Sequence, residues 1–369
     1  MQAPKNKQII AVHLLNDYSG SPLVFSTILK GLIRRGYQTT LFTSSSQGFL
    51  SDLDAQYHHL SYRWLPGRWI RLMAYLWSQL YLLLTLLRYR QQNVIIYVNT
   101  LLPFGAALAG VLMGKPVIYH IHETSVSPAL LKRFLRWVAN RTASEAIFVS
   151  HYLQEQEALN KVNGHTIYNG LSSAFLKAAN LKNKRDQQEA FRLLMLCSLR
   201  DYKGVREFTQ LASMLPDCQF DLVLNADQAA IDTYFAKLKI SPNLHIYPSQ
   251  SNVHQFYQKA DLVLNLSHPE QWIETFGMTI LEAMHYGIPC IVPPIGGPTE
   301  LIEDGQEGYL TDQRNIDQLF QQINYLKTQP QAYQQMANKA RLKSQSFSSQ
   351  VMINQVHHLV HQHLPPVSE

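Results

Sequence analysis

Apolar and polar positions divide the chain into alternating strand-length and helix-length segments. In the first half, apolar runs of strand length lie at 8–15, 38–43, 93–98, 115–121 and 146–150. A second series lies at 191–197, 221–225, 244–247 and 262–266. Most of the intervening segments repeat apolar residues at the period of one helix face. This alternation predicts an α/β protein with two parallel sheets.

The stretch 262–310 shows the alternation most clearly. A short apolar run at 262–266 leads into a polar loop at 267–275, and helical spacing then continues until Gly287 and Pro289 end it. In an open α/β sheet, the loop after a strand is the expected place for a ligand. The loop at 267–275 is therefore our first candidate for a binding site.

Two acidic residues frame the helix in this stretch. Glu274 lies in the loop before the first turn, and Glu282 follows eight residues later. On an unbroken helix this spacing returns to about the same face and spans about 12 Å. The pair could bind two hydroxyl-bearing ends of one extended ligand, or it could be two unrelated surface acids.

The start of the same helix offers a second binding element. The backbone amides around Phe276, Gly277 and Met278, together with the positive end of the helix dipole, favour a phosphate. Gly277 lets the backbone approach a ligand closely. A second glycine turn, Gly296-Gly297, opens another helix. Two such turns side by side predict a pocket for a diphosphate and a polyol.

Two cations follow the strand at 191–197. Arg200 and Lys203 lie in the loop at the head of the next helix. Such cations can neutralise a diphosphate leaving group and so help to break the bond to a sugar. Two exposed cations in a loop are also a common feature without function.

Length and composition favour two globular domains in a reducing compartment. The chain has 369 residues, a length greater than one hydrophobic core usually supports. Of these residues, 46% are apolar and 16% are charged, as in globular proteins. Three cysteines, Cys197, Cys218 and Cys290, are far apart in sequence, which predicts buried thiols. The polar residues at the N-terminus do not resemble a signal peptide, so we expect a cytoplasmic protein.

Charge is distributed unevenly along the chain. Residues 1–170 contain 16 Lys and Arg against 7 Asp and Glu, whereas residues 171–369 contain 16 against 19. A basic half suits lipid headgroups, phosphorylated acceptors or nucleic acid. We find no helix-turn-helix, zinc-finger or ribonucleoprotein pattern, so nucleic acid is not an expected partner.

The segment 64–89 is aromatic and apolar, and its length approaches that of a membrane span. Arg71 and Gln79 interrupt it. It could be a buried or half-buried helix, an interfacial helix whose aromatic face enters one leaflet, or a true span. The basic amphipathic helix predicted at 130–141 either has a solvated face or docks on a membrane together with this segment.

Several features of the second half occur in a fixed order within 40 residues. They are the pair Glu274 and Glu282, the run Glu282-Ala283-Met284, and the turn Gly296-Gly297 with Glu300. This combination resembles the retaining GT-B glycosyltransferases of family 4, also called glycosyl transferases group 1. The resemblance implies a GT-B fold, in which two Rossmann-like domains face each other across a central cleft.

The same resemblance implies the domain limits. Residues 1–170 would form an acceptor-binding domain, and 171–345 a domain that binds the nucleotide sugar. The helix predicted at 350–364 would pack back on the first domain. A turn containing Gly20 opens the first domain, where it either faces the ligand or only connects a strand to a helix.

Roles for individual residues also follow from the resemblance. Arg200, Lys203 and the amides of 276–278 would hold the donor diphosphate. Glu282 would bind the ribose and Glu274 the transferred sugar.

His122 and the loop at Gly20 would face the sugar and the acceptor. A strand-tip imidazole can donate a hydrogen bond to a sugar hydroxyl without carrying full charge. His120 fits a core histidine better, because alternation along the strand would aim it away from His122. Two histidines two residues apart could begin a metal site, but no third ligand is apparent.

The function implied is transfer of a sugar from a nucleotide-diphosphate donor to a glycan, lipid-linked or other acceptor, as in polysaccharide biosynthesis. Retention of anomeric configuration, a hexosyltransferase activity and independence of metals and cofactors are expected, and Asp52-Leu53-Asp54 would then be a surface loop. The alternatives are a GT-B nucleotide-sugar epimerase and a noncatalytic nucleotide-sugar-binding module. We expect a cytoplasmic protein that contacts the inner face of an anionic membrane peripherally.

Overall fold

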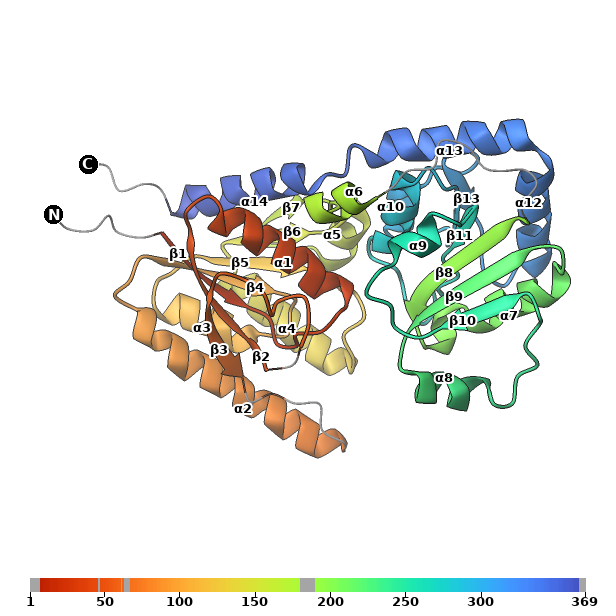
Figure 1. Cartoon of the computed structure of the whole chain (residues 1–369). Coiled ribbons are helices and arrows are strands. Elements are labelled where there is room, and N and C mark those ends of the chain that lie inside the picture. The colour runs from red at the N-terminus through yellow and green to blue at the C-terminus, as the bar shows by residue number, and fades with distance from the viewer. Residues whose placement is uncertain (1–6, 46, 61, 63–66, 180–189, 365–369) are drawn as a thin grey trace. The chain divides into compact units, whose positions relative to one another are not determined.

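The computed structural model describes residues 7–45, 47–60, 62, 67–179 and 190–364. It consists of two compact units (Figure 1). Unit 1 comprises Met1–Gly170 and Ser349–Glu369, and unit 2 comprises Leu171–Ser348. Each unit has its own parallel sheet and its own buried core.

Unit 1 is built on a seven-stranded sheet in the order β3-β2-β1-β4-β5-β6-β7, and every neighbouring pair is parallel. The strands are β1 (Gln8–Val12), β2 (Gln38–Ser44), β3 (Gln56–Leu60), β4 (Val94–Asn99), β5 (Val117–Ile121), β6 (Glu145–Phe148) and β7 (Asn163–Thr166). The chain moves outward in both directions from the pair β1 and β4. The carboxyl ends of these two strands therefore flank a topological switch point, where α/β proteins bind ligands.

Helices cover both faces of this sheet. They are α1 (Gly20–Ile33), α2 (Arg68–Leu86), α3 (Phe104–Leu112), α4 (Ala129–Thr142), α5 (His151–Glu157) and α14 (Ser349–His363), with a 3₁₀ turn η1 (Leu87–Tyr89) after α2. The last helix, α14, packs against α1, where a Cβ on Gly31 would lie only 2.5 Å from Cγ2 of Ile353. A glycine at position 31 thus allows the close approach of these two helices.

The helices α2, α3 and α4 pack in sequence, α3 lying between the other two. Gln79, which interrupts the apolar run of α2, is buried, and its Oε1 accepts a hydrogen bond from the Gly105 amide at 3.0 Å. The Tyr75 hydroxyl donates to the Leu102 carbonyl at 2.6 Å. These contacts fix α2 as a helix with one face packed on α3; residues 64–66 of the predicted segment lie outside the described part of the chain.

Unit 2 is built on a six-stranded parallel sheet in the order β10-β9-β8-β11-β12-β13. Its strands are β8 (Arg192–Ser198), β9 (Gln219–Asn225), β10 (Leu244–Tyr247), β11 (Leu262–Leu264), β12 (Cys290–Val292) and β13 (Gly308–Leu310). Successive strands are added outward in one direction from β8 and in the other direction from β11. This second switch point is the expected ligand position in unit 2.

The helices of unit 2 pack on both faces of its sheet around a core that includes Phe208, Phe220 and Leu222. They are α6 (Ser173–Ala178), α7 (Val205–Met214), α8 (Gln228–Phe235), α9 (His254–Tyr257), α10 (Met278–His285), α11 (Pro298–Leu301), α12 (Ile316–Thr328) and α13 (Pro330–Ser344), with a 3₁₀ turn η2 (Asp201–Lys203) before α7. All three cysteines are free thiols, and burial raises the pKa of Cys197 to about 12.

The structure contains elements that the apolar pattern did not predict. The edge strand β3 has the sequence QYHHL, in which only Leu60 is buried. An edge strand with one buried position lacks the apolar run that marks a strand. The strand β13 is three residues long, so it is too short to produce a recognisable pattern.

Candidate active site

Two loops meet at the switch point of unit 2, one after β8 and one after β11. The backbone amide of His268 donates a hydrogen bond to the Tyr202 carbonyl at 2.8 Å. The Lys203 ammonium approaches the Ser267 hydroxyl at 3.5 Å. Adjacent parallel strands deliver both loops to the same edge of the sheet. The contacts between them make one site from segments more than 60 residues apart.

An ion pair lies at the centre of this site. Nζ of Lys203 is 3.0 Å from Oε2 of Glu274, and both side chains are half-buried. The ammonium also lies 5.0 Å from the centre of the Trp272 ring, which stacks on Tyr202 at 5.6 Å between centroids. A carboxylate on one side and an aromatic ring on another restrict where this cation can point.

Gly204 follows Lys203 and allows the backbone there to approach the loop after β11 closely. Its φ angle is +80°, and a Cβ at this position would lie 2.3 Å from Cβ and 2.4 Å from the carbonyl oxygen of Leu266. Both the left-handed conformation and the contact with backbone require glycine. The helix α7 can therefore begin directly beneath the loop that carries Glu274.

Arg200 belongs to the same loop but makes a different set of contacts. Its carbonyl accepts a hydrogen bond from the Lys203 amide at 3.0 Å, while its side chain is exposed. Among the described residues, the Arg200 guanidinium has no hydrogen bond or ion pair. The structure thus joins Lys203 to Glu274 directly and leaves Arg200 at the edge of the site.

The start of α10 follows the Glu274 loop. Gly277 caps the helix with a φ angle of +99°, and its carbonyl accepts the Leu281 amide at 3.1 Å. The ring of Phe276 is buried against Phe347 at 6.0 Å, so Phe276 can offer a ligand only its backbone. The half-buried Met278 is the first residue of the helix.

The second glycine turn has a supporting role. The Gly297 amide donates to the Glu274 carbonyl at 2.9 Å, and a Cβ on Gly297 would lie 2.2 Å from the Thr275 carbonyl oxygen. Gly296 and Gly297 are both buried. Both glycines pack against the backbone of the loop that carries Glu274 and so hold that loop in place. That the two glycine turns line a pocket for a diphosphate and a polyol stays a prediction.

Glu282 lies on α10 and has a partner that the sequence did not indicate. The Tyr257 hydroxyl donates to Oε2 of Glu282 at 2.7 Å. Burial raises the pKa of Glu282 to about 7, although the bond from Tyr257 acts in the opposite direction. A carboxyl group with this pKa is poised to gain or lose a proton near neutral pH.

In unit 1, a chain of polar side chains lies at the carboxyl ends of β1, β4 and β5. Asn99 donates through Nδ2 to Nδ1 of His13 at 3.0 Å, and its Oδ1 accepts from Nε2 of His122 at 2.9 Å. Burial lowers the pKa of His13 to about 4 and that of His122 well below the usual value. Both imidazoles are therefore neutral at pH 7, and the Asn99 amide sets which ring nitrogen of each carries the proton.

His120 lies on the same side as His122, and our expectation that it points away was wrong. The two ring centres are 4.2 Å apart. Residues two apart on a strand share a face, which is why the rings meet. His120 is nevertheless a fully buried core residue, with Nδ1 at 3.1 Å from the Tyr97 hydroxyl.

Glu123 is a further acidic group at this position. Its carboxylate accepts hydrogen bonds from the amides of Leu101 at 3.1 Å and His122 at 3.2 Å. Burial raises the pKa of Glu123 to about 7. Sequence reasoning passed over this residue because a single acid after a strand carries no pattern.

The remaining predicted positions are exposed. Gly20 is the first residue of α1, and no atom lies within 4 Å of where its Cβ would be. Asp52 and Asp54 are exposed in a loop, as expected. Among the residues that the structure describes, no group of three or more His, Cys, Asp or Glu side chains is placed to hold a metal ion.

Two family models match consecutive parts of the chain. The model described as Glycosyltransferase Family 4 matches residues 18–175, and the model described as Glycosyl transferases group 1 matches residues 177–343. These matches and the two parallel sheets place the chain among the glycosyltransferases. Within that class, the chain belongs to the GT-B type.

Individual relatives agree with this class. The chain is 27% identical over 289 residues to N-acetyl-alpha-D-glucosaminyl L-malate synthase from Bacillus anthracis, which covers 72% of this chain and 74% of that protein. It is 26% identical over 180 residues to an uncharacterized glycosyltransferase from Haemophilus influenzae, which covers 47% of this chain and 50% of that protein. The matches thus span between half and three quarters of these relatives.

A solved structure confirms the predicted fold. HepE from Anabaena, in complex with UDP and glucose, aligns with a TM-score of 0.76 at 20% sequence identity, over 97% of this chain and 99% of that chain. At this identity the likeness establishes the fold, which is GT-B with two Rossmann-like domains.

Proposed function

We propose that the protein transfers a sugar from a nucleoside-diphosphate sugar to an acceptor, with retention of anomeric configuration and without a metal ion. The observation that carries this proposal is the 3.0 Å pair between Lys203 and Glu274, in the loop before α10. It sets a cation suited to a diphosphate next to a carboxylate suited to sugar hydroxyls. UDP and glucose in the HepE structure support testing UDP sugars as donors first.

Each group of the unit 2 site has a part in this proposal. Lys203, the exposed Arg200 and the amides at 276–278 bind the donor diphosphate. Glu282 accepts hydrogen bonds from the ribose, with Tyr257 fixing its orientation. Glu274 binds the hydroxyls of the transferred sugar.

The unit 1 groups act on the sugar and the acceptor. His122 is neutral and has its ring oriented by Asn99, so it can exchange a hydrogen bond with a hydroxyl group without adding charge. The exposed loop at Gly20 leaves room for a bulky acceptor. A glycan and a lipid-linked sugar are the acceptor classes that we propose.

The chemistry is dominated by charge. As the bond between sugar and phosphate stretches, positive charge grows on the sugar ring and negative charge grows on the departing diphosphate. Cations and helix amides already in place stabilise that negative charge without reorganisation. These groups supply the stabilisation for which other enzymes use a metal ion.

Substitution of the central pair tests this function. Lys203→Ala and Glu274→Ala should each lower sugar transfer by a factor of about 100 or more, as for other groups that stabilise a transition state electrostatically. Lys327→Ala is a matched control, because Lys327 forms a 2.6 Å ion pair with Asp217 elsewhere in unit 2. Transfer is measured as radiolabelled sugar incorporated into membrane or polysaccharide fractions. Full activity in either variant of the pair would contradict the proposal.

The same assay separates the alternatives. An epimerase would convert the donor without any acceptor, and a binding module would bind the donor without turnover. Transfer that depends on an added acceptor excludes both.

We also propose that the enzyme works at the cytoplasmic face of a membrane without spanning it.

A further inference from the structure

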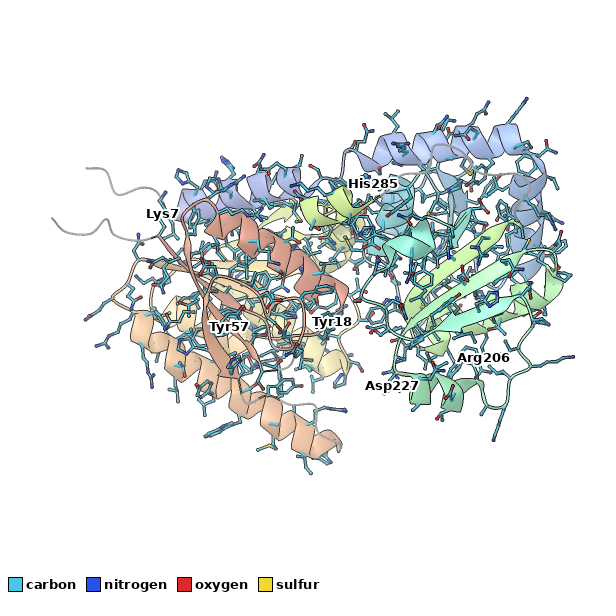
Figure 2. The ribbon with its side chains drawn as sticks, in the orientation of Figure 1. Lys7, Tyr18, Tyr57, Arg206, Asp227 and His285 are labelled. Carbon is cyan, nitrogen blue, oxygen red and sulfur yellow. The ribbon has the colours of Figure 1, made fainter. Side chains whose placement is uncertain are left out.

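The helix α2 presents an apolar face to the solvent. Trp69 and Trp77 are 72% and 67% exposed. Other exposed apolar residues continue this face: Ile70, Met73, Leu76, Leu80, Tyr81 and Leu84. Figure 2 shows side chains projecting from α2 away from the sheet. Exposed tryptophans in a contiguous apolar surface are typical of an interaction site.

The opposite face of α2 is already occupied. Tyr75, Gln79, Leu82 and Leu86 are buried against the rest of unit 1. They recur at helical spacing, three or four residues apart, so they form one face and the exposed residues form the other. Both faces of α2 are therefore apolar: one packs against the rest of unit 1, and the other is exposed to solvent.

The neighbouring helices α3 and α4 also carry exposed apolar side chains. Beneath them, aromatic rings join one helix to the next: the buried Tyr75 contacts the buried Phe104 at 5.9 Å, and Phe104 contacts the exposed Phe134 at 5.2 Å. Phe134 stacks at 6.3 Å on Trp137, which is 54% exposed. Val111, Leu112 and Leu130 add exposed apolar side chains on α3 and α4.

The exposed charges just after α2 and on α4 are basic, although Lys132 and Arg136 of α4 form ion pairs with the buried Glu157. Residues 55–122 contain no Asp or Glu but six Lys and Arg. Arg88 and Arg90 are exposed just after α2, and Arg133 and Arg141 are exposed on α4. The Arg141 guanidinium lies 5.0 Å over the Trp137 ring, which joins a cation to the aromatic surface.

We propose that α2, together with the exposed residues of α3 and α4, binds the interface of an anionic lipid bilayer. Tryptophans and arginines side by side suit the boundary between acyl chains and headgroups. The arginines suit anionic headgroups, and they would repel the same surface on a second copy of this chain. The membrane contact favours the lipid-linked acceptor; that preference rests on the proposed function, whereas the contact itself does not.

The structure also disfavours a transmembrane α2. Among the described residues, the segment Trp69–Tyr89, made of α2 and η1, is the one helical segment long and apolar enough to cross a bilayer, and it is partly buried within unit 1. Crossing would separate Gln79 from the amide of Gly105 and leave both polar groups in hydrocarbon. An in-plane helix keeps that hydrogen bond.

Vesicle co-sedimentation with the full chain tests the apolar part of the surface. Wild type should sediment with vesicles of phosphatidylglycerol and phosphatidylcholine, and much less with phosphatidylcholine alone. The double variant Trp69→Gln with Trp77→Gln should bind vesicles at least about tenfold more weakly than wild type, because two large apolar side chains no longer enter the leaflet. The control Tyr325→Gln with Leu342→Gln changes two exposed apolar residues of unit 2 and should bind like wild type.

A second pair of variants tests the charge. Arg133→Gln with Arg141→Gln should weaken binding to anionic vesicles by about tenfold or more, because each basic residue near the surface contributes. Lys30→Gln with Arg34→Gln removes the same charge from exposed positions at the end of α1 and just after it, and should have little effect. Unchanged binding in both surface variants would overturn the proposal.

Two further measurements distinguish the possible reasons for a lack of vesicle binding. If wild type binds no vesicles but sediments as a dimer that the tryptophan variant dissociates, the surface joins two copies of the chain and the proposal fails. Stabilisation by UDP is measured by thermal shift on the same samples. A variant that loses vesicle binding but is still stabilised by UDP has lost only the function of this surface. Wild type that binds vesicles but shows neither stabilisation by UDP nor sugar transfer contradicts only the proposed function.

Discussion

At the scale of single residues, Glu282 links the site to pH. Its raised pKa of about 7 means that near neutral pH the free protein is a mixture of protonated and ionised forms. Ribose hydroxyls donate to a carboxylate, so a donor bound in this way favours the ionised form. Affinity for the donor should thus be highest above pH 7 and should fall as the pH drops below it.

We therefore expect the dissociation constant of UDP-glucose to rise between pH 8 and pH 6, and binding at pH 6.5 to release protons. Isothermal calorimetry in two buffers with different ionisation enthalpies measures both effects. Glu282→Gln cannot titrate, so its affinity should be lower and nearly independent of pH. Tighter binding of wild type at pH 6 than at pH 8 contradicts this role of Glu282.

A second prediction concerns Asn99, whose amide bridges His13 and His122. Asn99→Asp places a carboxylate beside Nε2 of His122 and should raise the pKa of that imidazole. Nitrogen chemical shifts of the histidine rings, followed through a pH titration by NMR, report this change. An unaltered His122 titration would show that Asn99 does not control the proton on this ring.

Sequence reasoning found the charged residues of the site and missed their neutral partners. Glu274, Glu282 and Lys203 belong to recognisable local patterns. Trp272 and Tyr257 do not, because their contacts with Lys203 and Glu282 join residues that are distant in the chain. Spacing along one segment cannot predict which side chain of another segment completes a hydrogen bond.

At the scale of elements, Gly204 couples the start of α7 to the loop after β11. Gly204→Ala introduces a Cβ against the Leu266 backbone in a left-handed conformation. We expect a loss of about 2–4 kcal/mol in the free energy of unfolding, from strain and overpacking together. Urea denaturation measures this loss, and sugar transfer should fall with it because Lys203 is displaced.

Gly305→Ala separates the two contributions. Gly305 has a similar φ angle of +75°, but no atom lies within 4 Å of its Cβ position. This variant should lose only about 1–2 kcal/mol, the cost of the left-handed backbone alone. Equal losses in the two variants would show that the contact with Leu266 does not matter.

The helix α2 shows why some elements were predicted only in part. The apolar, aromatic stretch at 64–89 predicts a helix, and α2 confirms it for Arg68–Leu86. It does not reveal which residues pack, because both faces of this helix are apolar. Only the contact with α3 identifies the side of Tyr75 and Gln79 as buried and the side of Trp69 and Trp77 as exposed.

At the scale of the whole molecule, the two units share one plan with different contents. Each has a parallel sheet with a switch point at the carboxyl ends of two adjacent strands. In unit 2 that position holds a cation and acids, and in unit 1 it holds neutral histidines and an amide. The plan was predictable from alternating strands and helices, whereas the pairing of residues within each site required the structure.

A crystal structure of the protein with UDP would show where the diphosphate binds. We expect an oxygen of the diphosphate to lie about 3 Å from Nζ of Lys203, with further contacts from the amides at Gly277 and Met278. A diphosphate bound anywhere else, with Lys203 still paired only to Glu274, would rule out the proposed roles of Lys203 and the start of α10.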